Sequence, residues 1–330
     1  MTINRRTALA GAISLAAPGA PFAPTPLRAQ AWPSKIVRLL VPFAAGGPSD
    51  FIARLLINPL SEVLGQPVIV ENRAGANGNL GMQSVIQGEP DGYTLLHTTV
   101  TMLSVNPILY PEAQLRPMEE LAHISTTASL PNVLVVNPAM NIHSAAELVA
   151  LAKSKPGGLT CATFGPGSSS HILGSLFQKI AGFEAVPVTY RGSAPALVDV
   201  MGGRVDFLFD SMTTSVEQVR AGTVRGLAVT SPTRMPQLPD LPTMREIGFP
   251  GFDLTFWLSL QVAARTPQPI VERLQDALGK VMARKDYADA LRLRGAEPVI
   301  VPPRDLTAFI TRECARWASV SRDIGLQPAK

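Results

Sequence analysis

The chain has 330 residues, of which 46% are hydrophobic and 16% are charged, and its 29 basic and 25 acidic residues give a formal net charge of +4. No run of Lys and Arg supplies the clustered basic face that nucleic-acid binding requires, so we expect no nucleic-acid partner. Beyond the N-terminus, no segment reaches the roughly 18 consecutive apolar residues of a membrane helix.

The first 31 residues have the pattern of a secretory signal peptide. An Arg5-Arg6 pair precedes the apolar residues 8–17, and a small-x-small motif follows at residues 29–31. We therefore expect a periplasmic protein, cleaved near Ala31 and beginning near Trp32, and a disordered cytoplasmic N-terminus is the alternative. The arginine pair leaves twin-arginine export open beside the general secretory route. Removal of residues 1–31 leaves 26 basic and 25 acidic residues, so the mature chain is close to neutral.

Strand-like and helix-like segments alternate along the mature chain, which predicts an α/β protein with largely parallel sheets. The predicted strands are Ile36–Phe43, Val68–Glu71, Thr94–Thr98, Val133–Val136, Thr160–Phe164, Ala185–Tyr190, Val205–Phe209 and Arg225–Val229. The predicted helices are Asp50–Leu64, one that follows the loop Asn72–Asn79 and ends at Ile86, Ala145–Lys153, His171–Ala181 and Ala194–Met201.

Two extended segments, Asn132–Asn137 and Phe252–Val262, separate a central block of the chain from its two ends. They predict two doubly wound lobes joined by a two-strand hinge, an arrangement suited to ligand capture by domain closure. Residues 32–131 and 253–330 would form the first lobe, and residues 132–252 the second. A single continuous doubly wound domain is the alternative.

Three turns rich in small residues each lie between a predicted strand and the next helix, where open α/β sheets bind ligands. They are Val41–Asp50, Asn72–Gly81 and Phe164–His171. Glycines let the backbone approach a ligand closely, and free amides at a helix start attract an anion. Such residues also simply form turns and caps, but three turns at one edge of two lobes together favour a carboxylate site.

Two charged residues near these turns have alternative interpretations. Arg191 would contact a ligand carboxylate or lie at a solvated rim, and Asp210, expected just past a strand, would accept from a ligand or cap a turn. Ser168–Ser170, His171 and Asp210 also supply the residue types of a Ser-His-Asp hydrolase. No Gly-x-Ser-x-Gly elbow, dinucleotide fingerprint or Walker A motif is present, so we expect no enzyme.

The cysteine and histidine pattern favours neither a disulfide nor a metal site. Cys161 falls in a predicted strand and Cys314 in a C-terminal helix of the other lobe, so we expect two free, packed thiols, with a disulfide as the alternative. The four histidines have no short ligand spacing, and we therefore expect no metal and no cofactor.

Several motifs in order resemble one known family over essentially the whole mature chain. They are WPSKIVRLLVPFAAGGPSDFIAR (32–54), LGQPVIVENRAGANGNLG (64–81), DGYTLL (91–96), GPGSSSHILGSLF (165–177), TYRGSAPALVDVMGGRVDFLFD (189–210) and LPDLPTMREIGFPGFD (238–253). The chain resembles the Bug family, the extracytoplasmic solute receptors of tripartite tricarboxylate transporters. The resemblance implies a type II periplasmic binding protein fold. Residues 256–259 and 263–267 depart from the family pattern, which leaves the closure geometry open.

The resemblance also implies how the protein works. Backbone amides, hydroxyls and bridging waters of both lobes would hold a small organic acid, such as a dicarboxylate, a tricarboxylate, an acidic amino acid or an aromatic carboxylate. The expected partners are the membrane subunits of such a transporter, and a signalling ectodomain is the alternative; the receptor itself is expected to be a monomer. The expected ligand-binding residues are Phe43, Ala44, Ala45, Gly46, Gly47, Ser49, Asp50, Asn77, Ser168, Ser169, Ser170, His171, Arg191 and Asp210.

Overall fold

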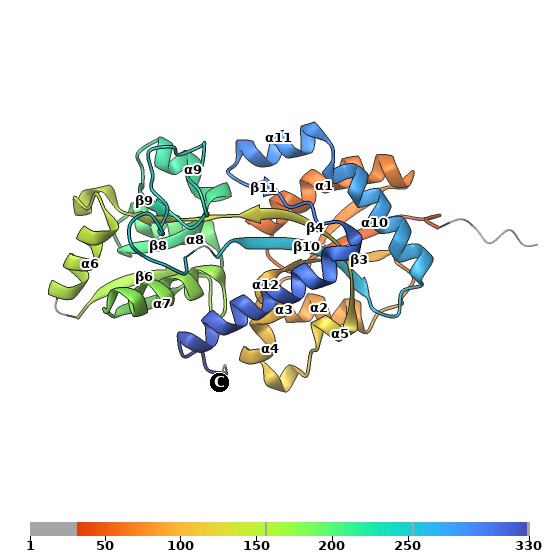
Figure 1. The fold of residues 1–330 in the computed structure, drawn as a ribbon, viewed down its shortest axis with the longest axis horizontal. Coiled ribbons are helices and arrows are strands. Elements are labelled where there is room, and N and C mark those ends of the chain that lie inside the picture. Colours follow the sequence, from red (N-terminus) through yellow and green to blue (C-terminus); the bar gives the residue numbers. More distant parts are fainter. Residues whose placement is uncertain (1–31, 156, 253, 329–330) are drawn as a thin grey trace, which may run out of the picture. The chain divides into compact units, whose positions relative to one another are not determined.

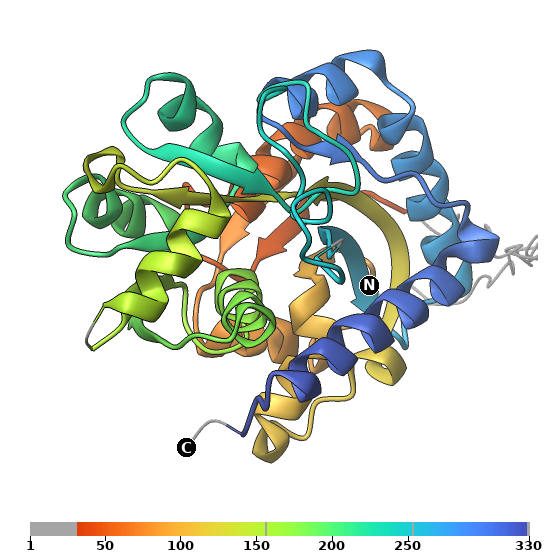
Figure 2. The same ribbon diagram turned by 60° about the vertical axis from the view of Figure 1, so that its left-hand side comes forward.

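The computed structural model describes residues 32–155, 157–252 and 254–328, and these residues form two β-sheets flanked by helices (Figures 1 and 2). The predicted signal peptide and its cleavage site lie outside the described residues. We call the elements around the six-stranded sheet the first lobe and those around the five-stranded sheet the second lobe.

The two sheets have matching strand orders. The first is β11-β4-β10-β3-β1-β2 and the second is β7-β6-β8-β5-β9. Five strands of each correspond in position and direction, because β10 and β5 are both antiparallel to their two neighbours. The strands are β1 (Val37–Val41), β2 (Val68–Asn72), β3 (Thr94–Thr99), β4 (Leu121–Leu130), β5 (Asn132–Val136), β6 (Leu159–Thr163), β7 (Ala185–Thr189), β8 (Phe207–Ser211), β9 (Arg225–Val229), β10 (Phe256–Ala263) and β11 (Glu297–Pro298).

The prediction of largely parallel sheets is wrong, since both sheets are mixed. β1, β2 and β3 are parallel to one another, as are β6, β7 and β8, whereas β10 and β5 run against their neighbours. The antiparallel strands arise because the chain passes between the sheets instead of returning through a helix. The sequence prediction also omitted β4, whose buried Thr126 and Thr127 and half-buried Ser125 and Ser129 interrupt the apolar pattern of a strand.

Helices cover both faces of each sheet. α1 and α10 pack on one face of the first sheet, and α2, α3 and α12 lie on the other side of it. In the second sheet, α7 packs on one face, and α8 and α9 cover the other. The helices are α1 (Pro48–Leu64), α2 (Asn79–Ile86), α3 (Val100–Ser104), α4 (Asn106–Leu109), α5 (Pro117–Glu120), α6 (Ala145–Ser154), α7 (Ser169–Ala181), α8 (Ser193–Met201), α9 (Met212–Arg220), α10 (Gln268–Met282), α11 (Lys285–Leu293) and α12 (Pro303–Asp323), with short 3₁₀ helices η1 (Ala76–Gly78), η2 (Pro111–Ala113) and η3 (Pro138–Met140).

Two connections join the lobes. Only Pro131 separates β4 from β5, and Figure 1 shows these two strands as an almost continuous extended run between the sheets. The second connection runs from β9 to β10, and the rings of Phe249 and Phe252 in it pack against Phe177 of α7 at centroid distances of 5.1 and 6.4 Å. An aromatic cluster thus anchors the returning segment to the second lobe.

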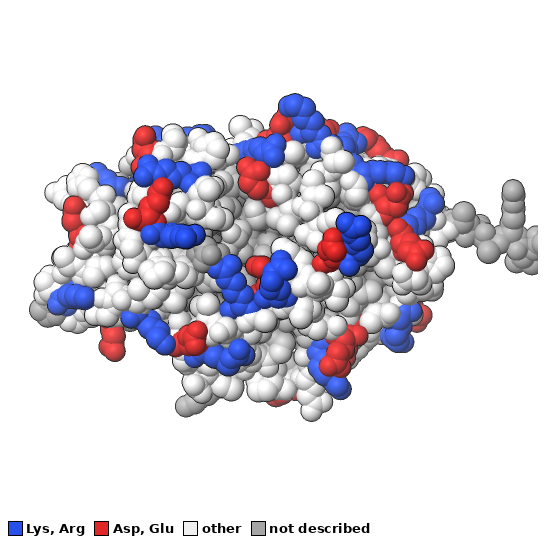
Figure 3. Space-filling view, viewed as in Figure 1, with Lys and Arg blue, Asp and Glu red and all other residues white. Residues whose placement is uncertain are grey.

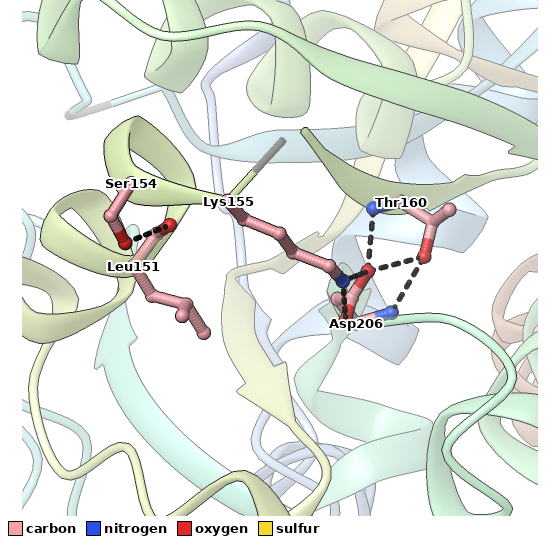
Figure 4. A network of polar contacts seen from close by, with 5 residues as sticks. All are labelled: Leu151, Ser154, Lys155, Thr160 and Asp206. Carbon is pink, nitrogen blue, oxygen red and sulfur yellow. Dashed lines mark hydrogen bonds and ion pairs between the residues drawn. The ribbon is translucent and has the colours of Figure 1, made fainter. Parts of the chain in front are cut away.

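Asp206 fixes the start of β8 through side-chain bonds (Figure 4). Its Oδ2 accepts from the Thr160 amide and hydroxyl, both at 2.7 Å, its own amide donates to Thr160 Oγ1 at 3.0 Å, and Lys155 Nζ lies 3.2 Å from Oδ1. These bonds replace ladder pairing at residues 205–206, and the strand begins two residues later than predicted.

The strand also ends two residues later than predicted. The expectation that Asp210 lies just past the strand is wrong, because Asp210 lies inside β8.

Cys161 and Cys314 are both free and buried, as expected. Burial raises the pKa of the Cys161 thiol to about 12, which makes it a poor nucleophile. Among the described residues, every helix is too short or too polar to cross a membrane. No group of three or more His, Cys, Asp or Glu in this part of the chain is arranged to hold a metal ion.

Basic and acidic residues are interspersed on the face drawn in Figure 3. Many surface charges of the described residues form exposed ion pairs, such as Arg234–Glu246 at 3.0 Å and Arg292–Glu297 at 2.9 Å. Exposed pairs of this kind contribute little to stability, so packing and buried hydrogen bonds carry the fold.

Candidate functional site

The turn between β1 and α1 is held in shape by Asp50. Its Oδ2 accepts from the Gly46 amide and from Arg54 Nε, both at 2.9 Å, and its Oδ1 accepts from Asn72 Nδ2 at 3.0 Å. The same Asn72 amide group donates to the Phe43 carbonyl at 3.1 Å. Asp50 is 3% exposed, so it positions the turn from below while Ala44, Ala45 and Gly46 are exposed.

The amides at the start of α1 remain free to meet an anion. Phe51 N donates to Gly47 O, but the Ser49 and Asp50 amides have no acceptor among the described residues. Such unpaired amides at a helix N-terminus favour a negatively charged ligand. Burial alone would raise the pKa of Asp50, but its bonds from Arg54, Gly46 and Asn72 outweigh burial and lower it.

Replacement of Asp50 by asparagine is expected to lower the free energy of unfolding by about 1–3 kcal/mol, because a buried amide cannot accept all of these hydrogen bonds. Urea unfolding at neutral pH measures the change. Asp276→Asn is the matched control, because that carboxylate is exposed and forms an ion pair with the exposed Lys280. Its effect should stay within about 0.5 kcal/mol, and an equal loss in both variants would contradict the role given to Asp50.

The turn between β2 and α2 has an unusual backbone. Ala76 and Asn77 have φ values of 45° and 52°, in the left-handed region that non-glycine residues seldom adopt. Asn106 braces this turn, since its Nδ2 donates to Asn77 O at 2.9 Å and to Asn79 Oδ1 at 2.6 Å. The Asn77 side chain donates from Nδ2 to Asn106 Oδ1 at 2.7 Å and to the Pro166 carbonyl of the second lobe at 3.4 Å.

The serines of the turn between β6 and α7 bond within the turn. Ser168 Oγ caps α7 by accepting from His171 N at 3.3 Å and donates to Gly165 O at 2.7 Å. Ser170 Oγ accepts from Phe164 N at 2.9 Å. The Ser169 and Ser170 amides have no acceptor among the described residues, so this helix start also offers free donors.

The residues of the hydrolase alternative do not form a catalytic triad. His171 Nδ1 accepts from the Gly167 amide at 3.1 Å, and burial lowers the pKa of this imidazole. Within the described part of the chain, no hydrogen bond joins the His171 imidazole to a serine hydroxyl or to Asp210. The imidazole therefore supports the turn rather than activating a nucleophile.

Asp210 and Arg191 lie in different surroundings. Asp210 is fully buried, and its Oδ2 accepts from Ser193 at 2.9 Å, from Thr214 at 2.7 Å and from Ser215 at 2.5 Å. Burial raises the pKa of Asp210 despite these bonds, and its Oδ1 has no partner among the described residues. It ties the starts of α8 and α9 together. Arg191 is exposed and makes no hydrogen bond or ion pair with a described residue.

Two further turns were missed by sequence reasoning. Thr99 caps α3 and its hydroxyl lies 3.1 Å from that of Thr101, while Ser211 caps α9 with its hydroxyl 2.8 Å from that of Thr213. They follow the corresponding strands β3 and β8, at the edge of each sheet that bears the other turns. A hydroxyl residue at the end of a buried strand was the available signal.

Hydrogen bonds link the predicted turns into one connected set. Asn72 joins the first turn to the second, Asn77 joins the second to Pro166 in the third, and Tyr190 N donates to Thr163 O at 2.8 Å. The strand-end turns of both lobes thus lie together. A cavity of about 360 Å³ borders the third turn, and it is lined by Leu109, Pro166, His171, Ser175 and residues 324–328.

Comparison with known proteins identifies the family. Residues 52–326 match the family model described as "Tripartite tricarboxylate transporter family receptor". The chain belongs to this family. It is 36% identical to BugT of Bordetella pertussis over 301 residues, which cover 91% of this chain and 92% of that protein.

Solved structures of similar proteins show the same fold. The periplasmic binding protein BugD has a TM-score of 0.84 at 32% identity, covering 90% of this chain and 100% of that one. An R. palustris protein solved with adipate has a TM-score of 0.85 at 34% identity, covering 90% and 100%. MatC from Rhodopseudomonas palustris with bound malate has a TM-score of 0.80 at 30% identity, covering 88% and 99%. The Bug-family resemblance and the two-lobed periplasmic binding protein fold are confirmed.

Membership of the tripartite tricarboxylate transporter receptor family bears on how the strand-end turns of the two lobes are interpreted. In a two-lobed solute receptor, a ligand lies between the lobes and favours their closed arrangement. The family is one of receptors, which agrees with the missing Ser-His-Asp geometry. The individual residues that touch the ligand stay a prediction.

Proposed function

We propose that this protein is a periplasmic receptor that binds a small organic carboxylate between its lobes and delivers it to the membrane subunits of a tripartite tricarboxylate-type transporter. The observation that carries the proposal is the connected set of strand-end turns, whose helix starts at α1 and α7 have free backbone amides. Adipate and malate are bound by similar proteins, so carboxylates of four to six carbons are the first candidates.

The proposed lobes comprise residues 32–131 with 253–330, and residues 132–252. Sheet membership supports these boundaries, because β1–β4, β10 and β11 form one sheet and β5–β9 the other. Residue 253 lies outside the described residues. We propose that the mature receptor is monomeric and begins near Trp32.

The carboxylate is proposed to bind mainly to backbone amides. The exposed residues Ala44 to Gly46 and the free amides of Ser49 and Ser169 are the proposed contacts, with Arg191 at the rim. Asp50, His171 and Asp210 are proposed to support the turns without contacting the ligand, since their side chains form hydrogen bonds with groups of the turns. Amides and helix dipoles attract any carboxylate, so the remaining shape of the cleft selects among acids.

Ala45→Glu is expected to weaken carboxylate binding by about 10- to 100-fold, because a negative side chain in the turn repels the ligand. Ala45 is exposed, so the fold should be unchanged. Isothermal titration with malate and adipate measures binding, after native mass spectrometry has identified any ligand retained during purification.

Ala139→Glu is the matched control for this test. Ala139 is also exposed but follows β5, whose end pairs with the start of β8, at the sheet edge opposite the turns. Its affinity should equal that of the unchanged protein. Equal weakening by both substitutions would show a general charge effect, and turnover of the bound acid would contradict a receptor function.

A further inference from the structure

The two lobes meet where the turn 75–79 of the first lobe lies against the turn 165–168 of the second. Asn77 Nδ2 donates to Pro166 O at 3.4 Å, and Gly167 lies directly against the first lobe. A Cβ atom added to Gly167 would overlap Leu109 Cδ1 and would lie 3.3 Å from Val105 Cγ1 and 3.4 Å from Asn77 Nδ2. A methyl group at this position therefore fits only if the buried Leu109 side chain moves.

The Asn77 side chain has no donor left for a ligand. Its amide nitrogen carries two hydrogens, and these are directed to Asn106 Oδ1 and to Pro166 O. Its remaining polar atom is an oxygen, which accepts hydrogen bonds only, as a carboxylate does. Asn77 is therefore unsuited to hold a carboxylate directly while this contact is formed.

The first-lobe half of the contact is built in advance of any ligand. Asn106 is 2% exposed and bonds to Asn77 O, Asn79 Oδ1 and Asn77 Nδ2. These bonds hold Ala76 and Asn77 in the left-handed region, and such backbone persists only where its surroundings enforce it. The surface that receives Pro166 and Gly167 is thus rigid.

We propose that this interlobe contact, formed by Asn77 and Leu109 with Pro166 and Gly167, is a closure contact that sets the affinity for every ligand without selecting among ligands. The proposal rests on the proposed receptor function. Asn77 contacts the other lobe instead of the ligand, and Asn106 is its positioning residue. Because the contact stabilises the closed arrangement itself, its loss reduces the binding-competent population and scales all affinities by one factor.

The test uses Gly167→Ala in the full mature chain. Both malate and adipate should bind more weakly by at least about fivefold, and the ratio of the two dissociation constants should not change. Adding Leu109→Ala removes the overlapping methyl group, so the double variant should bind both acids more tightly than Gly167→Ala does. Gly222→Ala is the control. Gly222 has a φ of 69°, similar to the 76° of Gly167, but no atom lies within 4 Å of a Cβ added there.

Small-angle X-ray scattering of the ligand-free proteins separates this proposal from the proposed function. Gly167→Ala should have a larger radius of gyration than the unchanged protein and Gly222→Ala, even if neither acid binds. If neither malate nor adipate binds and native mass spectrometry detects no retained ligand, the result would count against the receptor function alone. A changed affinity ratio, or scattering and affinities equal to those of Gly222→Ala, would overturn the closure contact.

Discussion

Phe177→Ala is expected to lower the free energy of unfolding by about 3–5 kcal/mol, the largest effect of any single substitution considered for this protein. Phe177 is fully buried in α7, and its ring lies within 5.1–6.4 Å of the rings of Phe183, Phe207, Phe209, Phe249 and Phe252. Truncation removes this contact area and leaves a cavity that rigid neighbours fill only in part. Urea unfolding followed by circular dichroism measures the loss.

The same substitution also tests how the second connection is anchored. Phe249 and Phe252 belong to the segment between β9 and β10, so loss of Phe177 should make that segment more accessible to proteolysis. Ile180→Ala is the control on the same helix, because Ile180 is 40% exposed. Its effect should be below about 1 kcal/mol, and a similar loss in both variants would contradict the anchoring role of the cluster.

The protein is expected to lose stability as the pH falls from about 6.5 towards 4 because His97 is buried in its neutral form. Burial lowers the pKa of His97 from 6.5 to about 4, and its ring nitrogens lie 3.5 Å from Ser49 Oγ and 3.2 Å from Thr127 Oγ1. The unfolded chain binds a proton below pH 6.5 and the folded chain does not. The contribution of neutral His97 to the free energy of unfolding is therefore complete above pH 6.5. It falls by about 3 kcal/mol by pH 4 and changes little below that pH.

Urea unfolding at pH 7 and pH 5 of the unchanged protein and of His97→Gln measures this dependence. The substitution should reduce the difference between the two pH values, whatever it does to stability at pH 7. His123 adds to the remaining slope, since burial also lowers its pKa to about 4. His143→Gln is the control because His143 is exposed. An unchanged pH difference in His97→Gln would contradict a neutral buried imidazole.

The expected ligand residues illustrate how far sequence reasoning reached. The turns Val41–Asp50 and Phe164–His171 were correctly placed between a strand and a helix, because apolar runs, glycines and cap residues are local signals. The roles of the side chains in these turns were harder to predict from the sequence. Asp50, Asn77 and Asp210 were predicted to contact the ligand, whereas the Asp50 carboxylate, Asn77 Nδ2 and Asp210 Oδ2 bond to other groups of the protein. Those partners lie up to 89 residues away along the chain.

The amino-acid sequence by itself determined the alternation of strands and helices, the small-residue turns and the receptor family, because these depend on local periodicity and on ordered motifs. Only the tertiary structure decided the strand pairing and the contacts of the site. β10 lies between β3 and β4 and runs against both, although about 126 residues separate it from β4. Likewise, Gly167 meets Leu109 and Asn77 meets Pro166 only after both lobes have folded. Such contacts arise from packing between distant segments, which no local pattern encodes.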